Sequence, residues 1–166
     1  MRGKGRFCWV MMLIIFVVPF FVSLSASSKE LTKTQLVGMY MNFLQKEGYS
    51  PILFPGGDVI LFKYEGGNFV IPVKEIVRDP QFFMVLFPNF WKIKNATEEE
   101  RALVSASYVN RTSKVVKIYL ENGNAQASAE IFLSSPEEFK LVFKEVLGAI
   151  QNGVVKFVRS MRGERI

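Results

Sequence analysis

The alternation of apolar and polar residues between Lys114 and Leu133 is the clearest structural signal in the chain. Two alternating runs flank Asn122-Gly123, a pair that tolerates the positive φ angles of a two-residue type I′ hairpin turn. Strand side chains alternate between faces, so folding about this turn places large residues opposite alanines on one face. The expected pairs are Leu120 with Ala125, Ile118 with Ala127 and Val116 with Ala129. Because the alanine side chains of this row are small, they leave space for a helix to pack on that face of the hairpin.

A long helix is predicted to follow the hairpin and to pack on the alanine row. Ser135-Pro136 supplies a cap and a proline at the first helical position. Apolar residues then recur at three- and four-residue spacing, and Asn152-Gly153 is a candidate break or end before the helix continues over residues 154–161. The stripe consists of Phe139, Val142, Phe143, Val146, Leu147 and Ile150.

Two earlier helices are also predicted. The first is capped by Thr34 and runs to about Glu47, where Gly48 supplies a left-handed stop. The middle helix begins at a capping box over residues 97–100 and runs to about Asn110. The three adjacent glutamates of that box point in different directions on a helical turn, so they favour a role in capping over one in metal binding.

Four further strands complete the predicted elements. Residues 52–54, 58–65 and 68–73 form a meander whose turns are the glycine pairs between them. Residues 81–90, ended by Pro88, are nearly all apolar and read as a strand buried on both faces or covered by another element. The pattern therefore predicts an α+β fold: an antiparallel sheet of two strand groups packed against an N-terminal, a middle and a long C-terminal helix.

The aromatic residues of residues 81–90 are the candidate binding surface, since they are much apolar area for so small a domain to bury. Burial in the core is the favoured reading, and an exposed patch that receives a partner is the alternative. The face of the hairpin opposite the alanines is expected to be mostly exposed to solvent. It carries Lys117, Tyr119, Gln126, Ser128 and Glu130. The candidate partner-binding residues are Phe82, Phe83, Phe87 and Phe90, with Tyr119 and Phe132 as a second set.

The first 26 residues have the layout of a signal peptide. Three basic residues precede an uncharged run from Cys8 to Val22, and small residues follow it at a possible cleavage point after Ala26. The run is shorter than the roughly 20 residues of a membrane-spanning helix and contains Pro19. We therefore expect a single domain over residues 27–166, periplasmic or secreted, with an uncleaved anchor as the alternative; contact with the membrane would be transient, through the signal segment.

Cysteine and histidine usage excludes several classes of chemistry. The chain has one Cys, in the leader, and no His. The mature domain thus lacks the residues for Ser-His-Asp or Cys-His catalysis and for zinc sites built on these ligands. No Gly-x-Ser-x-Gly or Ser-x-x-Lys arrangement is present either. We expect no catalytic residues, no metal site and no cofactor.

Charge gives no sign of a nucleic-acid partner. Loss of the leader leaves 18 of the 21 basic residues against 15 acidic ones, a net charge of about +3. These residues are scattered and are not gathered on one element beside stacking aromatics. Two Asn-x-Thr patterns, at Asn95 and Asn110, match the glycosylation acceptor, which matters only in a eukaryotic secretory pathway; a bacterial source is the favoured reading.

The order of elements resembles the YbjN-type sensory transduction regulator family, which has the type III secretion chaperone-like fold. The segments that carry the likeness are LVGMYMNFLQKEGY, DVILFKY, NFVIPV, DPQFFMVLF and ALVSASYVNRTSKVVKIYLENGNAQASAEI, within residues 33–152. The resemblance implies a non-enzymatic protein, commonly a homodimer, that holds an extended client segment on apolar surface. Those secretion chaperones work in the cytoplasm, whereas this chain carries an export signal.

Two functions are therefore expected from different classes. The first is an exported binding module that engages a protein or peptide segment through apolar surface, with main-chain pairing at a sheet edge. The alternative is a small-molecule or lipid carrier, in which the same aromatics line a closed pocket.

Overall fold

The computed structural model describes residues 31–79 and 81–164, so the predicted leader lies outside the described residues. Six strands form one antiparallel sheet in the order β1-β2-β3-β4-β6-β5, and the two predicted strand groups are joined between β3 and β4. The predicted α+β architecture is confirmed. The elements are α1 (Lys33–Lys46), β1 (Ile52–Leu53), β2 (Ile60–Tyr64), β3 (Gly67–Ile71), α2 (Val73–Ile76), β4 (Phe82–Lys92), α3 (Ala96–Thr112), β5 (Val116–Glu121), β6 (Asn124–Phe132), a short 3-10 turn η1 (Pro136–Glu138) and α4 (Phe139–Met161).

The β5–β6 hairpin has the predicted turn and register. Asn122 and Gly123 both have positive φ angles, 51° and 73°, as a type I′ turn requires. All three predicted pairs, from Leu120↔Ala125 to Val116↔Ala129, are present. The three alanines have no exposed surface, and α4 packs on β6, β5 and β4. The predicted packing of the last helix on the alanine row is confirmed.

The predicted continuation of the last helix to Met161 is confirmed, but the candidate break at Asn152-Gly153 is wrong, because α4 is uninterrupted there. Gly153 is buried where α4 meets the hairpin, and a Cβ added there would lie 2.7 Å from Cγ1 of Val116. The glycine lets helix and strand approach closely, and the helix tolerates it because its packed face supplies the stability that the residue lacks.

The aromatic core lies where α1 meets the first half of α4. The ring of Tyr40 is 4.7 Å from that of Phe139 and 5.9 Å from that of Phe83. Gly48 ends the α1 region with φ 84°, as predicted. The predicted cap at Thr34 is wrong: Thr32 accepts the Gln35 amide through its side chain, and the Gln35 side chain accepts the Thr32 amide.

The middle helix α3 also begins earlier than predicted. Asn95 is the cap, and its Oδ1 accepts the Glu98 amide at 2.9 Å. The predicted capping box at residues 97–100 is therefore wrong. The Glu98 carboxylate instead accepts the Lys94 amide at 2.8 Å and the Trp91 indole N–H at 3.0 Å. Glu98 thus links the end of β4 to the first turn of α3. A separate difference from the sequence prediction is the short helix α2, which was not predicted.

Strand β4 does not end at Pro88 as predicted. The pairing with β6 runs from Phe82↔Phe132 to Phe87↔Ala127, shifts, and resumes at Trp91↔Ala125. The residues between form a bulge in which Asn89 has φ 52°. Pro88 lies in this bulge, where the missing amide N–H interrupts no ladder bond.

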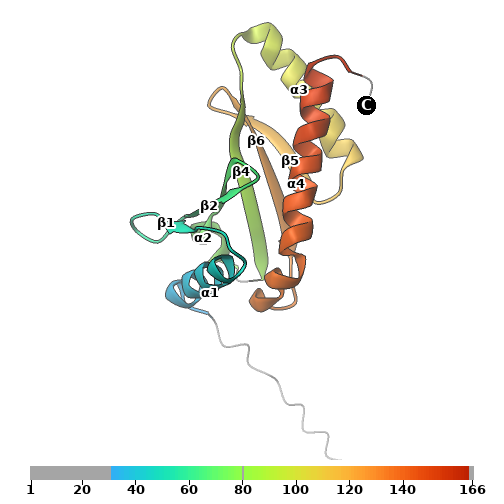
Figure 1. Cartoon of the computed structure of the whole chain (residues 1–166). Coiled ribbons are helices and arrows are strands. Elements are labelled where there is room, and N and C mark those ends of the chain that lie inside the picture. The colour runs from blue at the N-terminus through green and yellow to red at the C-terminus, as the bar shows by residue number, and fades with distance from the viewer. Residues whose placement is uncertain (1–30, 80, 165–166) are drawn as a thin grey trace, which may run out of the picture.

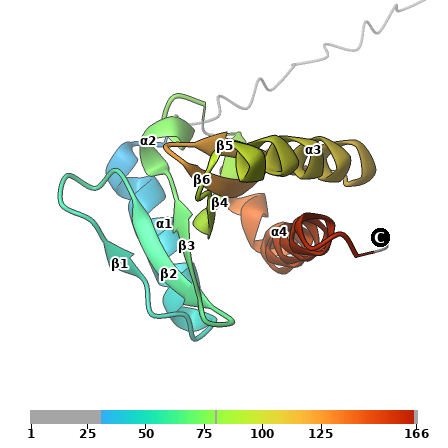
Figure 2. The same cartoon turned by 90° about the horizontal axis from the view of Figure 1, so that it is seen from above.

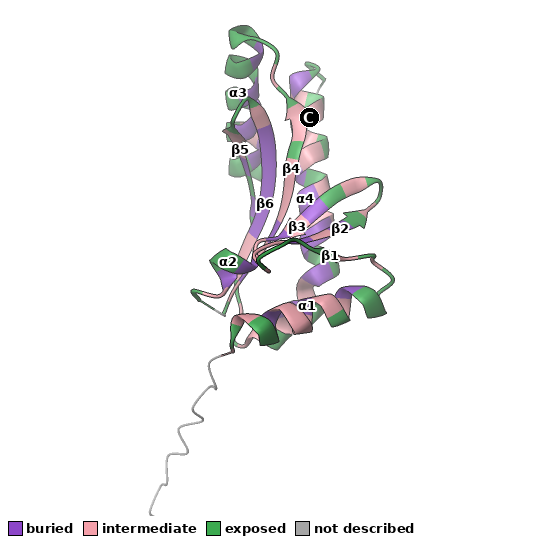
Figure 3. Cartoon of the chain, turned by 90° about the vertical axis from the view of Figure 1, so that its left-hand side faces the viewer, coloured by how far each residue is buried: buried purple, intermediate pink, exposed green. Residues whose placement is uncertain are grey.

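The long helices cover one face of the sheet. Figure 1 shows α4 standing alongside β4 and β6, while α1 lies across the bottom of the molecule, below β1 and β2. Viewed from above, α3 lies beyond β5 at the opposite end of the sheet from β1 (Figure 2). Figure 3 looks at the other face, and no helix crosses in front of β6 there. We call this uncovered side the outer face; it carries the residues that alternate with the buried ones along each strand.

Candidate functional site

The outer face carries a row of apolar side chains that crosses four strands. The register pairs Ile52 of β1 with Leu61 of β2, Leu61 with Val70 of β3, and Val70 with Leu86 of β4. Residues directly opposite each other in a sheet share a face. We call these four residues the apolar row. Their neighbours along the strands, such as Ile60 and Val85, are fully buried on the helix side, so the row itself faces away from the core.

The apolar row is accessible to solvent. Ile52 is 59% exposed, and Leu61, Val70 and Leu86 are partly exposed. Phe82 and Phe132 extend the surface at one end, where their rings pair across β4 and β6 with centroids 5.4 Å apart. Phe132 is 75% exposed. A partly exposed apolar surface that continues across several strands differs from the isolated apolar residues of an ordinary surface and is the kind of area that a partner covers.

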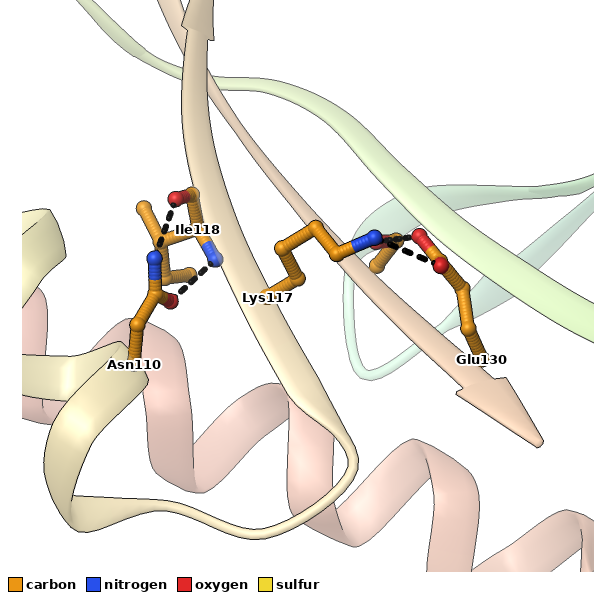
Figure 4. A network of polar contacts seen from close by, with 5 residues as sticks. Asn110, Lys117, Ile118 and Glu130 are labelled. Atoms are coloured by element: carbon orange, nitrogen blue, oxygen red, sulfur yellow. Dashed lines mark hydrogen bonds and ion pairs between the residues drawn. The ribbon is translucent and has the colours of Figure 1, made fainter.

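Polar side chains continue the row on β6 and β5. Leu86 pairs with Ser128, and Ser128 pairs with Lys117. Glu130 accepts hydrogen bonds from both, at 2.8 Å from the Ser128 hydroxyl and 2.6 Å from the Lys117 ammonium (Figure 4). The expectation that this face is mostly wet is wrong for β6, since Ser128 has no exposed surface and Gln126 only 6%. Strand β6 lies between β4 and β5, so side chains of both neighbouring strands flank Ser128 and Gln126.

Tyr119 lies beside these residues on β5. It is partly exposed and pairs with Gln126, whose amide donates to Glu121 at 2.8 Å. Burial raises the pKa of the Tyr119 phenol, and the nearby carboxylates of Glu121 and Glu130 raise it further. The phenol therefore stays neutral at physiological pH and can both donate and accept a hydrogen bond.

The two edges of the sheet differ in their free main-chain groups. At β5, the side-chain amide of Asn110 on α3 makes two bonds to Ile118, donating to its carbonyl at 2.9 Å and accepting from its amide at 2.7 Å (Figure 4). Asn110 thus stands in for a neighbouring strand and blocks that edge.

At β1, the Phe54 amide donates to the Val59 carbonyl at 3.0 Å. Paired and unpaired residues alternate along an antiparallel strand, so the main-chain groups of Leu53 point away from β2. The side chains of Ile52, Leu53 and Phe54 are all exposed. The β1 edge is therefore apolar and open to a further strand.

The structure separates the predicted binding residues into two groups. Phe82, Tyr119 and Phe132 lie on the outer face. Phe83 is buried, with its ring 5.4 Å from that of Phe139. Phe87 and Phe90 lie on the helix side, where Phe87 stacks on Phe69 at 4.5 Å and Phe90 meets Phe157 at 5.3 Å. These rings pack against one another, as expected if this part of the aromatic run belongs to the core. They therefore line no pocket at those contacts.

A second surface feature lies between α3 and the end of α4. It is a shallow depression of about 500 Å³ lined by Leu103, Val104, Ser107, Tyr108, Arg111 and Ser160. It lies at the far end of the sheet from β1 and shares no residue with the apolar row.

The described residues hold no group of three or more His, Cys, Asp or Glu placed to bind a metal ion. No helix within residues 31–79 and 81–164 has the length and apolar character to cross a membrane. The carboxylate with the most distinctive surroundings is Glu98, whose pKa is lowered mainly by the Lys94 amide and also by the Trp91 indole N–H. Both bonds are structural links between β4 and α3.

Searches against protein-family models, curated proteins and solved structures find no match to this chain.

Sequence reasoning missed the apolar row as a unit. The alternation in residues 58–65 and 68–73 correctly places Leu61 and Val70 on the opposite face from their buried neighbours. The row itself forms only when the four strands are aligned. That alignment depends on a single pair, Val70↔Leu86, between β3 and β4. No local turn fixes this pair, because α2 and a loop lie between the two strands.

Proposed function

We propose that this protein is an exported, non-enzymatic binding module that holds an extended segment of another protein against the outer face of its sheet. The observation that carries the proposal is the apolar row from Ile52 to Leu86, which no element of the described chain covers. Alternate side chains of an extended segment would rest on the row and on the Phe82–Phe132 pair, which would remove this surface from water.

The β1 edge supports an extended partner over a helical one. The outward amide and carbonyl of Leu53 match the main chain of an added strand, and the exposed side chains of Ile52 and Phe54 flank them. The opposite edge is closed by Asn110, so a strand would add at β1 only. Because β1 has two residues, main-chain pairing contributes few bonds and the affinity is expected in about the micromolar range.

The finer assignments belong to the same proposal. The resemblance to the YbjN-type family, with its type III secretion chaperone-like fold, supports a role in holding a client or in regulation. The signal-peptide layout of residues 1–26 supports a periplasmic or secreted location. Sequencing the amino terminus of protein recovered from outside the cytoplasm tests this location: a start near Ser27 is expected, and a start at Met1 would contradict cleavage.

Binding of an unfolded polypeptide tests the proposed site. The probe is a fluorescent, reduced and carboxymethylated protein titrated with the purified chain. Ile52→Lys and Phe132→Lys place charges on two exposed positions of the outer face and should each weaken binding about tenfold. Val155→Lys is the matched control, since Val155 is 55% exposed on α4 and Ile52 is 59% exposed.

The expected result is loss of affinity in the two outer-face variants and none in the control. Absence of binding by the wild-type protein, or equal losses in all three variants, would contradict the proposal. Because the substituted side chains are exposed, unchanged melting temperatures are expected and would separate a binding defect from unfolding.

A further inference from the structure

Two stretches that carry basic but no acidic residues lie side by side in the fold. Residues 101–120 hold four Lys and Arg residues, and residues 146–163 hold three. They meet where α3 packs on the end of α4, and the Ser105 hydroxyl donates to the Ser160 hydroxyl at 2.8 Å across this contact. The fold therefore gathers at one end of the molecule basic residues that are scattered along the sequence.

The acidic residues of α3 lie at the opposite end of the helix from its last basic residue. Residues 98–100 are glutamates near its start, whereas Arg111 lies in its last turn. Glu100 and Arg111 are 11 positions apart, about 16 Å along a helix, which is about twice the screening length at physiological ionic strength. Glu164, just after α4, pairs with two arginines at the end of that helix. Arg111 and Lys114 are exposed and take part in no ion pair within the described residues, so their charges are available to a partner.

Exposed apolar side chains accompany these basic ones. Leu103 and Val104 on the outer side of α3 are 56% and 70% exposed, although a surface helix normally has a single apolar stripe that faces the core. Helical spacing places them on the same side as Tyr108 and Arg111, and all four line the shallow depression of about 500 Å³. Figure 3 shows the exposed side of α3 turned away from the sheet. The outer side of α3 thus combines apolar side chains with a guanidinium group.

Val115, in the turn after α3, adds an apolar side chain in a strained conformation. Its φ angle is 56°, in the left-handed region that branched residues avoid and that glycine or asparagine adopts with less strain. Its carbonyl accepts the Glu130 amide at 3.3 Å, and the next amide, of Val116, donates to the Lys114 carbonyl at 2.7 Å. The Val115 side chain is 51% exposed, so burial does not offset the strain. A valine at this position indicates a contact outside the chain.

We propose that the outer side of α3 and the turn after it dock on the surface of an anionic lipid bilayer. We call this the basic surface; it consists of Leu103, Val104, Tyr108, Arg111, Lys114 and Val115. The three aliphatic side chains would enter the boundary between headgroups and acyl chains, and the two cations would contact lipid phosphates. Contact of the protein with a membrane would then continue after the signal segment is lost, beyond the transient contact expected from the sequence.

The mixture of side chains favours a bilayer over other anionic partners. A nucleic acid is bound by basic residues beside stacking aromatics, and it would leave Leu103, Val104 and Val115 in water. A bilayer surface removes these side chains from water and supplies anionic phosphates at the same depth. The basic surface lies beyond the β5 end of the sheet, whereas the apolar row begins at β1 (Figure 2). Docking therefore leaves the row free, and the proposal does not depend on the proposed function.

Co-sedimentation with vesicles tests the docking. The probes are vesicles of phosphatidylcholine alone and of equal parts phosphatidylcholine and phosphatidylglycerol, mixed with the protein as it is recovered after export. All variants share one amino terminus, so any remaining leader contributes equally to each. We expect binding to the anionic vesicles at least about tenfold stronger than to the neutral ones. Binding should weaken at least about tenfold between about 0.05 M and about 0.5 M salt.

Substitutions identify the surface. Arg111→Gln and Lys114→Gln should each weaken binding to anionic vesicles about fivefold. Val115→Asn should weaken it about three- to tenfold and raise the melting temperature by about 2 to 4 °C, because asparagine adopts the left-handed conformation with less strain. The controls are Lys140→Gln and Leu141→Asn, a basic and an apolar residue that are adjacent and exposed in the first turn of α4, at the far end of that helix. They should leave binding within about twofold of wild type.

Four results would overturn the proposal. One is equal binding to neutral and anionic vesicles, and another is a loss of binding in the two control variants as large as in the variants of the basic surface. The third is a Val115→Asn protein with a lower melting temperature, which would give the valine a structural role. The fourth is displacement from the vesicles by soluble polyglutamate at equal charge concentration, which would identify an acidic protein as the partner.

Discussion

Replacing Gly153 by alanine tests the close contact between α4 and the hairpin. Two effects compete in this variant. Alanine stabilises a helix interior by about 1 kcal/mol relative to glycine. Against this, the new methyl group would lie 2.7 Å from Cγ1 of Val116 and 3.6 Å from Cγ1 of Val109. The Val116 side chain is 7% exposed and is stiff about χ1 because it is branched at Cβ, so it cannot turn away freely.

The magnitude follows from weighing these terms. Overpacking a filled core costs about 1 to 3 kcal/mol, which equals or exceeds the helix gain. Gly153→Ala should therefore range from neutral to about 2 kcal/mol less stable. Gly148, five residues earlier in α4, has no atom within 4 Å of an added Cβ. Gly148→Ala should gain about 0.5 to 1 kcal/mol, so the two variants should differ by about 1 to 3 kcal/mol.

Urea unfolding followed by circular dichroism measures this difference directly. The double variant Gly153→Ala with Val116→Ala provides the internal check, because removing the obstructing methyl groups should make the two changes non-additive by about 1 kcal/mol or more. If Gly153→Ala stabilises the protein as much as Gly148→Ala does, the helix does not approach the hairpin as closely as the structure indicates and the reasoning is refuted.

Three further outcomes follow from individual side chains. Asn110→Ala leaves the amide and carbonyl of Ile118 without partners, so it should lower the free energy of unfolding in urea by about 1 to 3 kcal/mol. The variant should also aggregate faster, which turbidity would measure. Unchanged stability would argue against a blocked β5 edge. The pKa of the Glu98 carboxyl is lowered, mainly by the Lys94 amide, so its ionised form stabilises the fold above the ordinary carboxyl pKa, and this contribution is lost as pH falls through the lower folded pKa. The melting-temperature gap between wild type and Glu98→Gln should therefore narrow as the pH is lowered below the ordinary carboxyl range, and a constant gap would count against it. In urea unfolding, Asn95→Ala should lower the free energy of unfolding by about 1 kcal/mol and Thr97→Ala by less than about 0.5 kcal/mol. The reverse order would favour Thr97, the cap predicted from the sequence.

The parts of the fold predictable from the sequence are those that local chemistry determines. Asn122-Gly123 fixes a two-residue turn, and that turn fixes every pair of the β5–β6 hairpin. The alanine row then demands a helix, and the apolar spacing after Ser135 supplies it. Each step depends on residues that are close in sequence, so no long-range information is needed.

The errors arise where two local signals compete or where a distant contact decides. Both Asn95 and Thr97 are good caps, and the structure uses Asn95 because Glu98 then reaches the Trp91 indole across the end of β4. Gly153 has the sequence character of a helix end, but its reason for being small lies in Val116, 37 residues earlier. Pro88 resembles a strand end, whereas a bulge accommodates it.

The candidate site was predictable only in part for the same reason. Tyr119 and Phe132 share the outer face because both belong to one hairpin whose register the turn fixes. The apolar row needs four strands in register, and its join at Val70↔Leu86 is a long-range pair. Alternation divides the first part of the aromatic run between faces, with Phe82 outside and Phe83 inside, whereas the bulge after Phe87 brings Phe90 to the helix side as well. The sequence shows neither the bulge nor which face the helices cover.

Methyl NMR of the chain during titration with an unfolded polypeptide tests the central claim most directly. The proposed site predicts that the methyl signals of Ile52, Leu61, Val70 and Leu86 shift together with a single dissociation constant. The methyl signals of Val155 on α4, which is 55% exposed against 59% for Ile52, should not shift. Shifts confined to the helices, with the apolar row unaffected, would contradict the claim that the outer face is where this protein binds.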